Sequence, residues 1–161
     1  MEAMPEGAGS VRVPIGMRTG RVDDKGRLKL PQEMIEYFRS LPEKELYVTS
    51  LDARMGQVYL MSVWLQNEKF FQEFRGKPGL TQDVGFIAAA LGAPAEMDAQ
   101  GRIQLPAKLR KQLGLEEGGV HVYRYKSRIQ VLSEALFQEK FGAALQGVEA
   151  KVQELESDGL Q

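Results

Sequence analysis

A stretch of ten residues occurs twice in the chain and restricts its fold more than any other feature. Residues 22–31 (VDDKGRLKLP) recur 75 residues later as residues 97–106 (MDAQGRIQLP), and five of the ten positions are identical. At the other positions that should face a core, one apolar residue replaces another. Weaker similarity continues in the same order downstream of each copy, so we infer an internal duplication.

Each copy predicts a tight turn followed by a short strand. The Asp-x-x-Gly run is typical of turns, because a short acidic residue bonds nearby backbone and glycine accepts a positive φ. The following residues alternate strictly between polar and aliphatic, which is the pattern of a strand with one buried face. The outward-facing positions are then Arg27, Lys29, Arg102 and Gln104.

Helices are expected after each strand and at the end of each copy. Pro31 and Pro106 suit the first position of a helix, and the second of these helices is predicted over residues 107–113, ending at Gly114. A helix is also expected over residues 62–74, with Ser62 as its N-cap. A connecting helix is expected to begin after Thr81 as its cap, and a last helix to run from Ser133 to Glu156. Apolar residues of the last helix follow a nearly heptad spacing over residues 137–155, which predicts a packing seam.

Charge is separated along the chain although the formal net charge is only −1. Residues 10–30 hold six basic and two acidic residues, and residues 101–128 hold seven basic and two acidic residues. The segments 31–100 and 149–161 are both acidic. Basic clusters of this kind are compatible with nucleic-acid binding even where the whole protein is neutral. An ordinary solvated face is the alternative interpretation.

Composition argues against several other classes of protein. The chain has no cysteine and one histidine, which removes disulfides, thiolate metal sites and most routes to a zinc site or catalytic triad. We find no phosphate-binding loop, dinucleotide fingerprint or nucleophile elbow. No apolar run approaches the ~20 residues that a membrane span needs, and the N-terminus does not look like a secretory signal. We therefore predict no enzyme, no cofactor, no metal, no small-molecule substrate and no membrane partner.

The paired Asp-x-x-Gly-Arg motifs make the chain similar to a known family. One motif per chain is typical of the SpoVT/AbrB-like superfamily, and two motifs separated by a helix such as FIAAALGA (residues 86–93) resemble the MraZ family. The resemblance covers about residues 16–141. It implies an α+β, β-rich fold made of two tandem swapped-hairpin β-barrel modules with short helices and a longer C-terminal helix. One departure is the run QEMI (residues 32–35), which lacks two basic residues usual in the family.

The same resemblance implies a division of the chain and a function. The expected ranges are a disordered extension (1–15), a first module (16–75), a linker and connecting helix (76–93), a second module with the C-terminal helix (94–148) and an acidic tail (149–161). The implied function is a cytoplasmic, nucleoid-associated transcriptional regulator of the division and cell-wall gene cluster. It would form a homo-oligomeric ring and bind short direct repeats in double-stranded DNA. The alternative is an oligomeric protein-interaction module that does not bind DNA.

The predicted DNA-binding residues have a second, structural interpretation. The resemblance implies DNA contacts by Arg27 and Arg102, and the basic hairpin adds Arg21, Lys25 and Lys29. An arginine four residues after an aspartate is equally suited to hold the turn closed, and both roles are compatible if only part of the guanidinium is used. The other motif residues are expected to be structural: Asp23, Gly26, Asp98 and Gly101. His121 is expected to face outward or to pack in the sheet.

Overall fold

Eight strands and six helices form the protein in a computed structural model that describes residues 4–116 and 118–161. In chain order they are β1 (Arg18–Val22), β2 (Arg27–Lys29), α1 (Gln32–Ser40), β3 (Leu46–Thr49), β4 (Gly56–Leu60), α2 (Met61–Glu73), α3 (Pro78–Leu91), β5 (Ala93–Ala95), β6 (Arg102–Gln104), α4 (Ala107–Leu113), β7 (Gly118–Tyr125), β8 (Arg128–Ser133), α5 (Glu134–Leu145) and α6 (Val148–Ser157). Among the described residues, no helix combines the length and apolarity that crossing a membrane requires.

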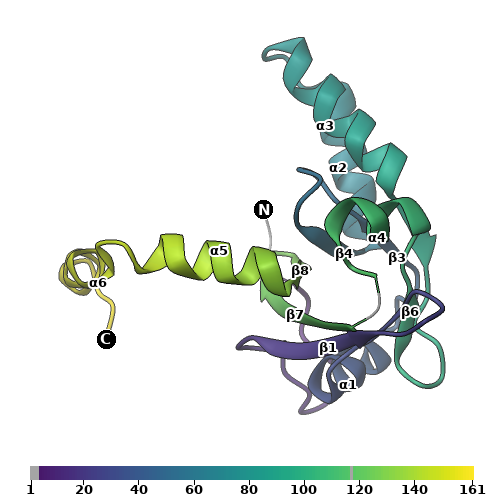
Figure 1. Ribbon diagram of the computed structural model, residues 1–161, viewed down its shortest axis with the longest axis horizontal. Helices are drawn as coiled ribbons and strands as arrows, with labels where there is room; N and C mark the ends of the chain where they lie inside the picture. The colour runs from purple at the N-terminus through teal and green to yellow at the C-terminus, as the bar shows by residue number, and fades with distance from the viewer. Residues whose placement is uncertain (1–3, 117) are drawn as a thin grey trace.

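All eight strands belong to one antiparallel sheet in the order β5-β3-β4-β8-β7-β1-β2-β6. The two outer strands, β5 and β6, follow one another in the chain, and the sheet curls into a nearly closed barrel (Figure 1). Four of the strand pairs join one copy of the repeat to the other: β1 with β7, β3 with β5, β2 with β6 and β4 with β8. The predicted fold class is confirmed, and both copies contribute to a single barrel.

The barrel interior is filled by the aliphatic residues that the alternation predicted to point inward. Leu28 of β2 and Ile103 of β6 are fully buried and lie opposite one another. The helix that follows each strand covers this core, with Met34, Ile35 and Phe38 buried on α1 and Leu109 and Leu113 on α4. The predicted bounds of α4 are confirmed, and Gly114 follows in the left-handed conformation at φ 68°. Pro31 and Pro106 lie one position ahead of the predicted one, as the residues that precede each helix.

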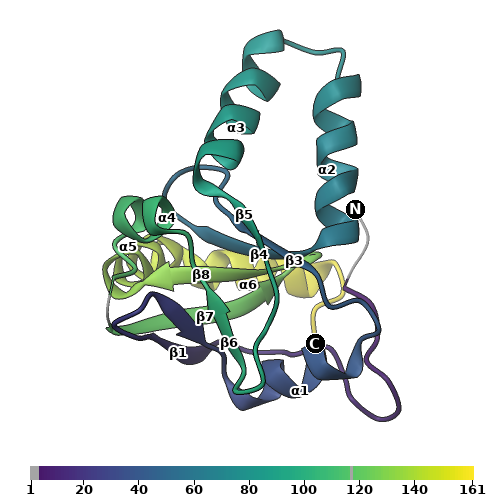
Figure 2. The ribbon, with the colours of Figure 1, turned by 90° about the vertical axis from the view of Figure 1, so that its right-hand side faces the viewer.

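Two helical projections leave the barrel in different directions. Helices α2 and α3 rise side by side from the β3–β4–β5 part of the sheet, whereas α5 and α6 form an arm that packs only at its base, on β7 and β8 (Figures 1 and 2). Trp64 fixes the first projection because it is buried, stacks on Tyr47 with ring centroids 4.7 Å apart, and contacts Phe71 at the edge. Leu136 fixes the arm in a small cluster with Leu132 and Met55.

The predicted caps of the first projection are wrong. Helix α2 begins at Met61, and Ser62 is already helical: its backbone N–H and hydroxyl both donate to the Glu43 carboxylate at 2.8 and 2.7 Å. A partner 19 residues earlier in the chain thus takes the place of the local cap. Helix α3 begins at Pro78 rather than after Thr81, because proline is favourable at the first helical position, where an N–H has no helical partner.

The prediction of one continuous C-terminal helix is also wrong. Ser133 does cap α5, and its hydroxyl accepts a bond from the backbone N–H of Leu136 at 3.1 Å. The helix stops at Leu145, however, and Gly147 takes up φ 65° before α6 begins. A left-handed residue cannot continue a right-handed helix. The apolar seam predicted over residues 137–155 is therefore divided between two helices.

The structure also describes most of the N-terminal extension. Met4 is buried in the main core cluster, and the Tyr37 hydroxyl donates to the carbonyl of Pro5. Residues 1–3 of the extension lie outside the described residues. The division of the chain into the predicted ranges remains a prediction.

Candidate nucleic-acid interface

The two Asp-x-x-Gly-Arg turns have the same geometry. In the first, the Asp23 Oδ1 atom accepts from the backbone N–H of Lys25 at 3.0 Å and of Arg27 at 2.9 Å, and Oδ2 accepts from Arg27 Nε at 2.7 Å. In the second, the corresponding distances from Asp98 to Gln100, Arg102 N and Arg102 Nε are 2.9, 2.9 and 2.8 Å. Each aspartate closes its turn and holds the arginine four residues later. The turns therefore contain the structural contact that the spacing suggested.

These contacts determine the charge state of the turns and leave part of each guanidinium outside them. Backbone hydrogen bonds from Arg27 lower the pKa of Asp23, and those from Arg102 lower the pKa of Asp98, with the arginine side chains adding to the effect. Both carboxylates remain ionised at neutral pH. The arginines bind through Nε, so the Nη amino groups of Arg27 and Arg102 are not part of the closing contact. The structural role and a phosphate-binding role are compatible in this geometry.

Glycine is required in both turns for two reasons. Gly26 and Gly101 have φ values of 78° and 79°, which side-chain-bearing residues rarely adopt. A Cβ atom on Gly26 would lie 1.7 Å from Arg110 Nη1, and one on Gly101 would lie 2.2 Å from Ile35 Cδ1. Each turn is thus covered by the helix that follows the other turn.

The two copies exchange contacts around a pseudo-two-fold axis between β2 and β6. The backbone N–H of Leu30 donates to the Gly101 carbonyl at 3.1 Å, and that of Leu105 donates to the Gly26 carbonyl at 3.0 Å. Side chains repeat the exchange, since Lys29 Nζ donates to the Gln100 carbonyl and Gln104 Nε2 donates to the Lys25 carbonyl at 3.1 Å. The hairpin of one copy is therefore built on the turn of the other.

Three of the five predicted DNA-binding residues form one row across the strands. Arg21 of β1 is paired with Lys29 of β2, and Lys29 is paired with Arg102 of β6. Neighbouring strands lie about 4.8 Å apart, so adjacent members of this row are close. Arg21 and Lys29 are exposed and Arg102 is partly exposed. The three line an open hollow of about 860 Å³, together with Asp23 and Asp24 of the first turn. We call them the basic row.

The other two predicted residues lie on the far side of the buried Leu28–Ile103 pair. Arg27 of β2 is paired with the uncharged Gln104 of β6, so no second cation lies opposite it. Lys25 is exposed at the tip of the first turn. The sequence repeat did not reveal which positions become neighbours, because strand pairing across copies joins residues more than 70 positions apart. Arg110, which lies against Gly26, was missed for the same reason.

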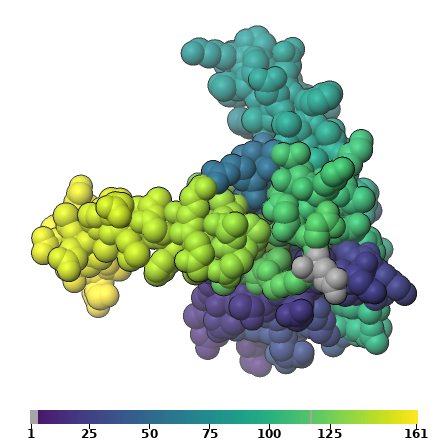
Figure 3. Space-filling view, in the orientation of Figure 1, coloured from purple at the N-terminus to yellow at the C-terminus, as the bar shows by residue number. Residues whose placement is uncertain are grey.

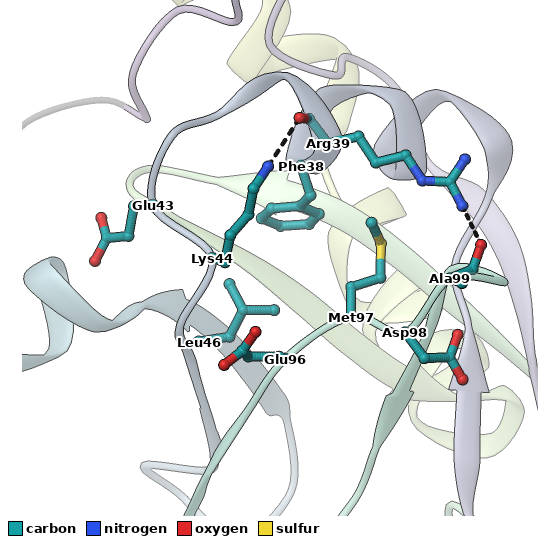
Figure 4. A pocket seen from close by; sticks show the side chains of 9 residues that line it. All are labelled: Phe38, Arg39, Glu43, Lys44, Leu46, Glu96, Met97, Asp98 and Ala99. Atoms are coloured by element: carbon teal, nitrogen blue, oxygen red, sulfur yellow. Dashed lines mark hydrogen bonds between the residues drawn. The ribbon is translucent and has the colours of Figure 1, made fainter.

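The second turn lies against α1, and residues of both line a small cavity (Figure 4). Arg39 donates through Nη2 to the Ala99 carbonyl, and Lys44 Nζ donates to the Arg39 carbonyl at 2.9 Å. The cavity has a volume of about 220 Å³, which is below the roughly 300–1,000 Å³ of ligand pockets. Its lining includes both acidic and basic side chains, and of the two bonds drawn in Figure 4 the one from Arg39 to Ala99 ties the turn to the helix.

His121 lies between the sheet and the C-terminal arm. Its Nε2 atom is 2.7 Å from Glu134 Oε1, and its ring stacks on Phe137 with the centroids 3.9 Å apart. A hydrogen bond from Gln138, together with the one to His121, lowers the pKa of Glu134. His121 thus has partners that hold the base of α5 against β7.

Comparisons with known proteins identify the family of the chain. A family described as "MraZ protein, putative antitoxin-like" matches residues 92–147. A protein named Transcriptional regulator MraZ from Acidobacterium capsulatum is 30% identical over 127 residues, which cover 77% of this chain and 84% of the relative. Proteins of the same name from Koribacter versatilis and Frankia alni are 33% and 36% identical, covering 60% and 63% of this chain and 66% and 68% of those proteins. The chain belongs to the MraZ family of transcriptional regulators.

Proposed function

We propose that the protein is a non-enzymatic transcriptional regulator that binds double-stranded DNA through the basic row and the first turn. The observation that carries this proposal is the alignment of Arg21, Lys29 and Arg102 on one outward face of the sheet. Lys25 and the Nη groups of Arg27 would add contacts beside the row. The hairpin β1–β2 carries two of the three row residues, and two-stranded ribbons can enter the major groove of B-form DNA.

The electrostatics of this face favour phosphate over other anions of lower charge density. Duplex DNA carries one negative charge per about 1.7 Å of helix axis, so several cations in a row neutralise phosphates and release counterions. Phosphate contacts alone give dissociation constants of roughly 10⁻⁴ to 10⁻⁶ M. One chain therefore supports weak binding, and several linked chains would bind more tightly through their effective concentration.

Self-association is part of the same proposal. Large apolar side chains of the arm are exposed, and they include Phe141, Leu145, Val152 and Leu155. We propose that copies of the chain assemble into a ring through such surfaces and that the ring binds short direct repeats upstream of the division and cell-wall gene cluster. A cytoplasmic, nucleoid-associated location follows from this role. We also propose that the chain is divided into the ranges predicted from its sequence, with a first module over residues 16–75 and a second over residues 94–148. The exposed arm equally suits an interaction module without DNA binding, which is the second candidate function.

Fluorescence anisotropy tests the proposal with the duplex upstream of the protein's own operon and a scrambled duplex at two salt concentrations. The variant Arg21→Ala/Lys29→Ala should bind more weakly, and its salt slope should fall by about 2, because about 0.9 counterions are released per phosphate contact. The matched control is Glu96→Ala, since residue 96 occupies the position of Arg21 in the second copy. It should not weaken binding. Equal, weak binding of both duplexes by the unsubstituted protein would favour the interaction module.

A further inference from the structure

The last helix of the arm, α6, carries an exposed apolar stripe with an acidic edge. Val148, Val152 and Leu155 follow one another by four and three positions, so they share one face of the helix. Glu149 and Glu156 lie three positions before and four positions after Val152, which places both beside that face. A helix of this kind normally buries its apolar face against a partner. We call these five residues the α6 stripe.

The shape of the arm keeps this stripe away from the barrel of its own chain. All residues from Gln138 to Gln161 are exposed. Gly147 turns the chain at φ 65°, so Figure 1 shows α5 from the side and α6 nearly end-on. In Figure 3 the arm stands clear of the body, with the yellow atoms of α6 at its far end. A surface that covers the stripe therefore comes from another molecule.

A hollow of about 380 Å³ beside the β7–β8 hairpin has apolar walls. Tyr123, Tyr125 and Arg128 line it from the hairpin, Met55 lines it from the segment before β4, and Lys140 lines it from α5. Tyr125 is 40% exposed, so its ring is open to a partner. Pockets of this kind receive the few apolar side chains that anchor a protein–protein contact.

Cations surround the exposed tyrosine ring. The guanidinium carbon of Arg128 lies 5.2 Å from the centroid of the Tyr125 ring, and Lys126 Nζ lies 5.3 Å from the same centroid. Arg128 is fixed in place because its Nε donates to Gln57 Oε1 at 2.9 Å. Lys126 and Lys140 are exposed and have their charge in contact with solvent. We call Tyr123, Tyr125, Lys126, Arg128 and Lys140 the tyrosine hollow.

An acidic side chain, Asp52, also lines this hollow. Its Oδ1 atom accepts from the backbone N–H groups of Arg54 and Met55, both at 2.9 Å, so the carboxylate is engaged within its own turn. Three cations against this one carboxylate leave the hollow positive. It therefore complements the α6 stripe in both respects, with aromatic rings for the apolar face and cations for the acidic edge.

We propose that the α6 stripe of one copy docks in the tyrosine hollow of a second copy. This inference rests on the self-association within the proposed function and names its two surfaces. Because the surfaces differ, the contact is heterologous, and a repeated heterologous contact closes into a ring when the rotation between copies allows it. Each copy carries one stripe and one hollow, so every stripe in the ring is covered. Pairing of two stripes with each other would end at a dimer.

Charge reversal tests the docking at both surfaces. Glu149→Lys/Glu156→Lys changes the stripe, and Lys126→Glu/Lys140→Glu changes the hollow. In sedimentation velocity, each variant alone should show an association weaker by about tenfold or more, because like charges then face each other. An equimolar mixture should regain the assembly, since the reversed stripe fits the reversed hollow and the two unchanged surfaces still fit each other. Thermal unfolding should match that of the unsubstituted protein, because all four side chains are exposed.

Controls carry the same charge changes away from the contact. Lys108→Glu/Lys111→Glu reverses two exposed lysines of α4, neither of which lines the hollow, and should leave the assembly intact. On α6, Glu156→Lys is compared with Glu154→Lys. Residue 154 lies two positions after Val152 and so points away from the stripe. The substitution at position 156 should weaken the assembly, and the one at position 154 should not.

The outcomes separate this inference from the proposed function. If the unsubstituted protein assembles and both double variants keep its mass, the docking is overturned while self-association stands. If the stripe variant dissociates and the hollow variant does not, the stripes pair with each other and the docking is overturned. Failure of the mixture to regain the assembly would also overturn it. An unsubstituted protein that stays monomeric at every concentration would overturn both the docking and the proposed ring.

Discussion

Individual residues of the turns act across the boundary between the two copies. Gly26 and Gly101 have nearly identical φ values, yet each faces a different side chain of the opposite copy. The terminal nitrogen of Arg110 lies at the end of a flexible chain and can move away from position 26. Ile35 is buried in the core, so its side chain has much less room to move away from position 101. The same motif therefore tolerates change differently at its two sites.

Substitution of the turn glycines should reveal this difference. We expect Gly26→Ala to lower the free energy of unfolding by about 1–3 kcal/mol, from backbone strain and a displaced Arg110. Gly101→Ala should cost more, because Ile35 must move within a packed core. Gly142→Ala is the control, since it lies inside α5 with open space around its Cβ position, and it should stabilise by about 0.5–1 kcal/mol. Urea denaturation measures all three, and equal losses at positions 26 and 101 would contradict the explanation.

At the scale of elements, the turns are densely hydrogen-bonded, whereas the C-terminal arm is mostly exposed. Each turn is held by five hydrogen bonds among residues at most four positions apart: two between backbone groups and three to the aspartate carboxylate. The three bonds to each carboxylate are stronger when the carboxylate is ionised. The arm has its contacts at the base of α5 and none of its residues beyond Phe137 is buried.

Acid should therefore destabilise the turns. The pKa of Asp23 and that of Asp98 are both lowered from the ordinary value of 3.8, so ionisation stabilises the folded state above that pH. This stability is lost as the pH falls below about 4 towards the folded pKa. We expect Asp23→Asn/Asp98→Asn to show a smaller loss of unfolding free energy between pH 5 and pH 3 than the unsubstituted protein. Asp24→Asn serves as the control, and a decline equal to that of the double variant would contradict the assignment.

The whole molecule is one barrel in which pairs of neighbouring strands come in turn from the two copies. The strand pairs β1–β7, β3–β5, β2–β6 and β4–β8 all cross the midpoint of the chain. Separating the copies would expose strand edges and the buried Leu28–Ile103 pair. Stability therefore belongs to the complete chain rather than to either repeat.

Fragments test this statement. Residues 1–92 and 93–161, expressed separately, should each lack a cooperative unfolding transition as monomers, because each fragment loses its partner strands. An equimolar mixture should recover a cooperative transition and native-like strand content by circular dichroism. A monomeric fragment that unfolds cooperatively by itself would show instead that one copy folds independently.

Features that depend on near neighbours were predictable from the sequence. The alternation in residues 27–30 and 102–105 predicted two strands, and the spacing of Asp, Gly and Arg predicted turns whose contacts span four residues or fewer. The Gly114 signal also predicted the end of α4, because a left-handed glycine ends a helix whatever surrounds it. The resemblance of the two motifs to the MraZ family was visible for the same reason, because all residues of each motif lie close together in the sequence.

Tertiary structure decided the features that join distant residues. Glu43 took the hydrogen bonds of Ser62, so the predicted cap of α2 was lost. Strand pairing brought Arg21, Lys29 and Arg102 into one row and placed Arg110 of the second copy on Gly26 of the first. Local propensities contribute a few tenths to about one kilocalorie per residue, whereas burial of the shared core selects one pairing of all strands. The sequence by itself determined the turns, strands and family of this protein, and only the fold determined which charged side chains share a surface.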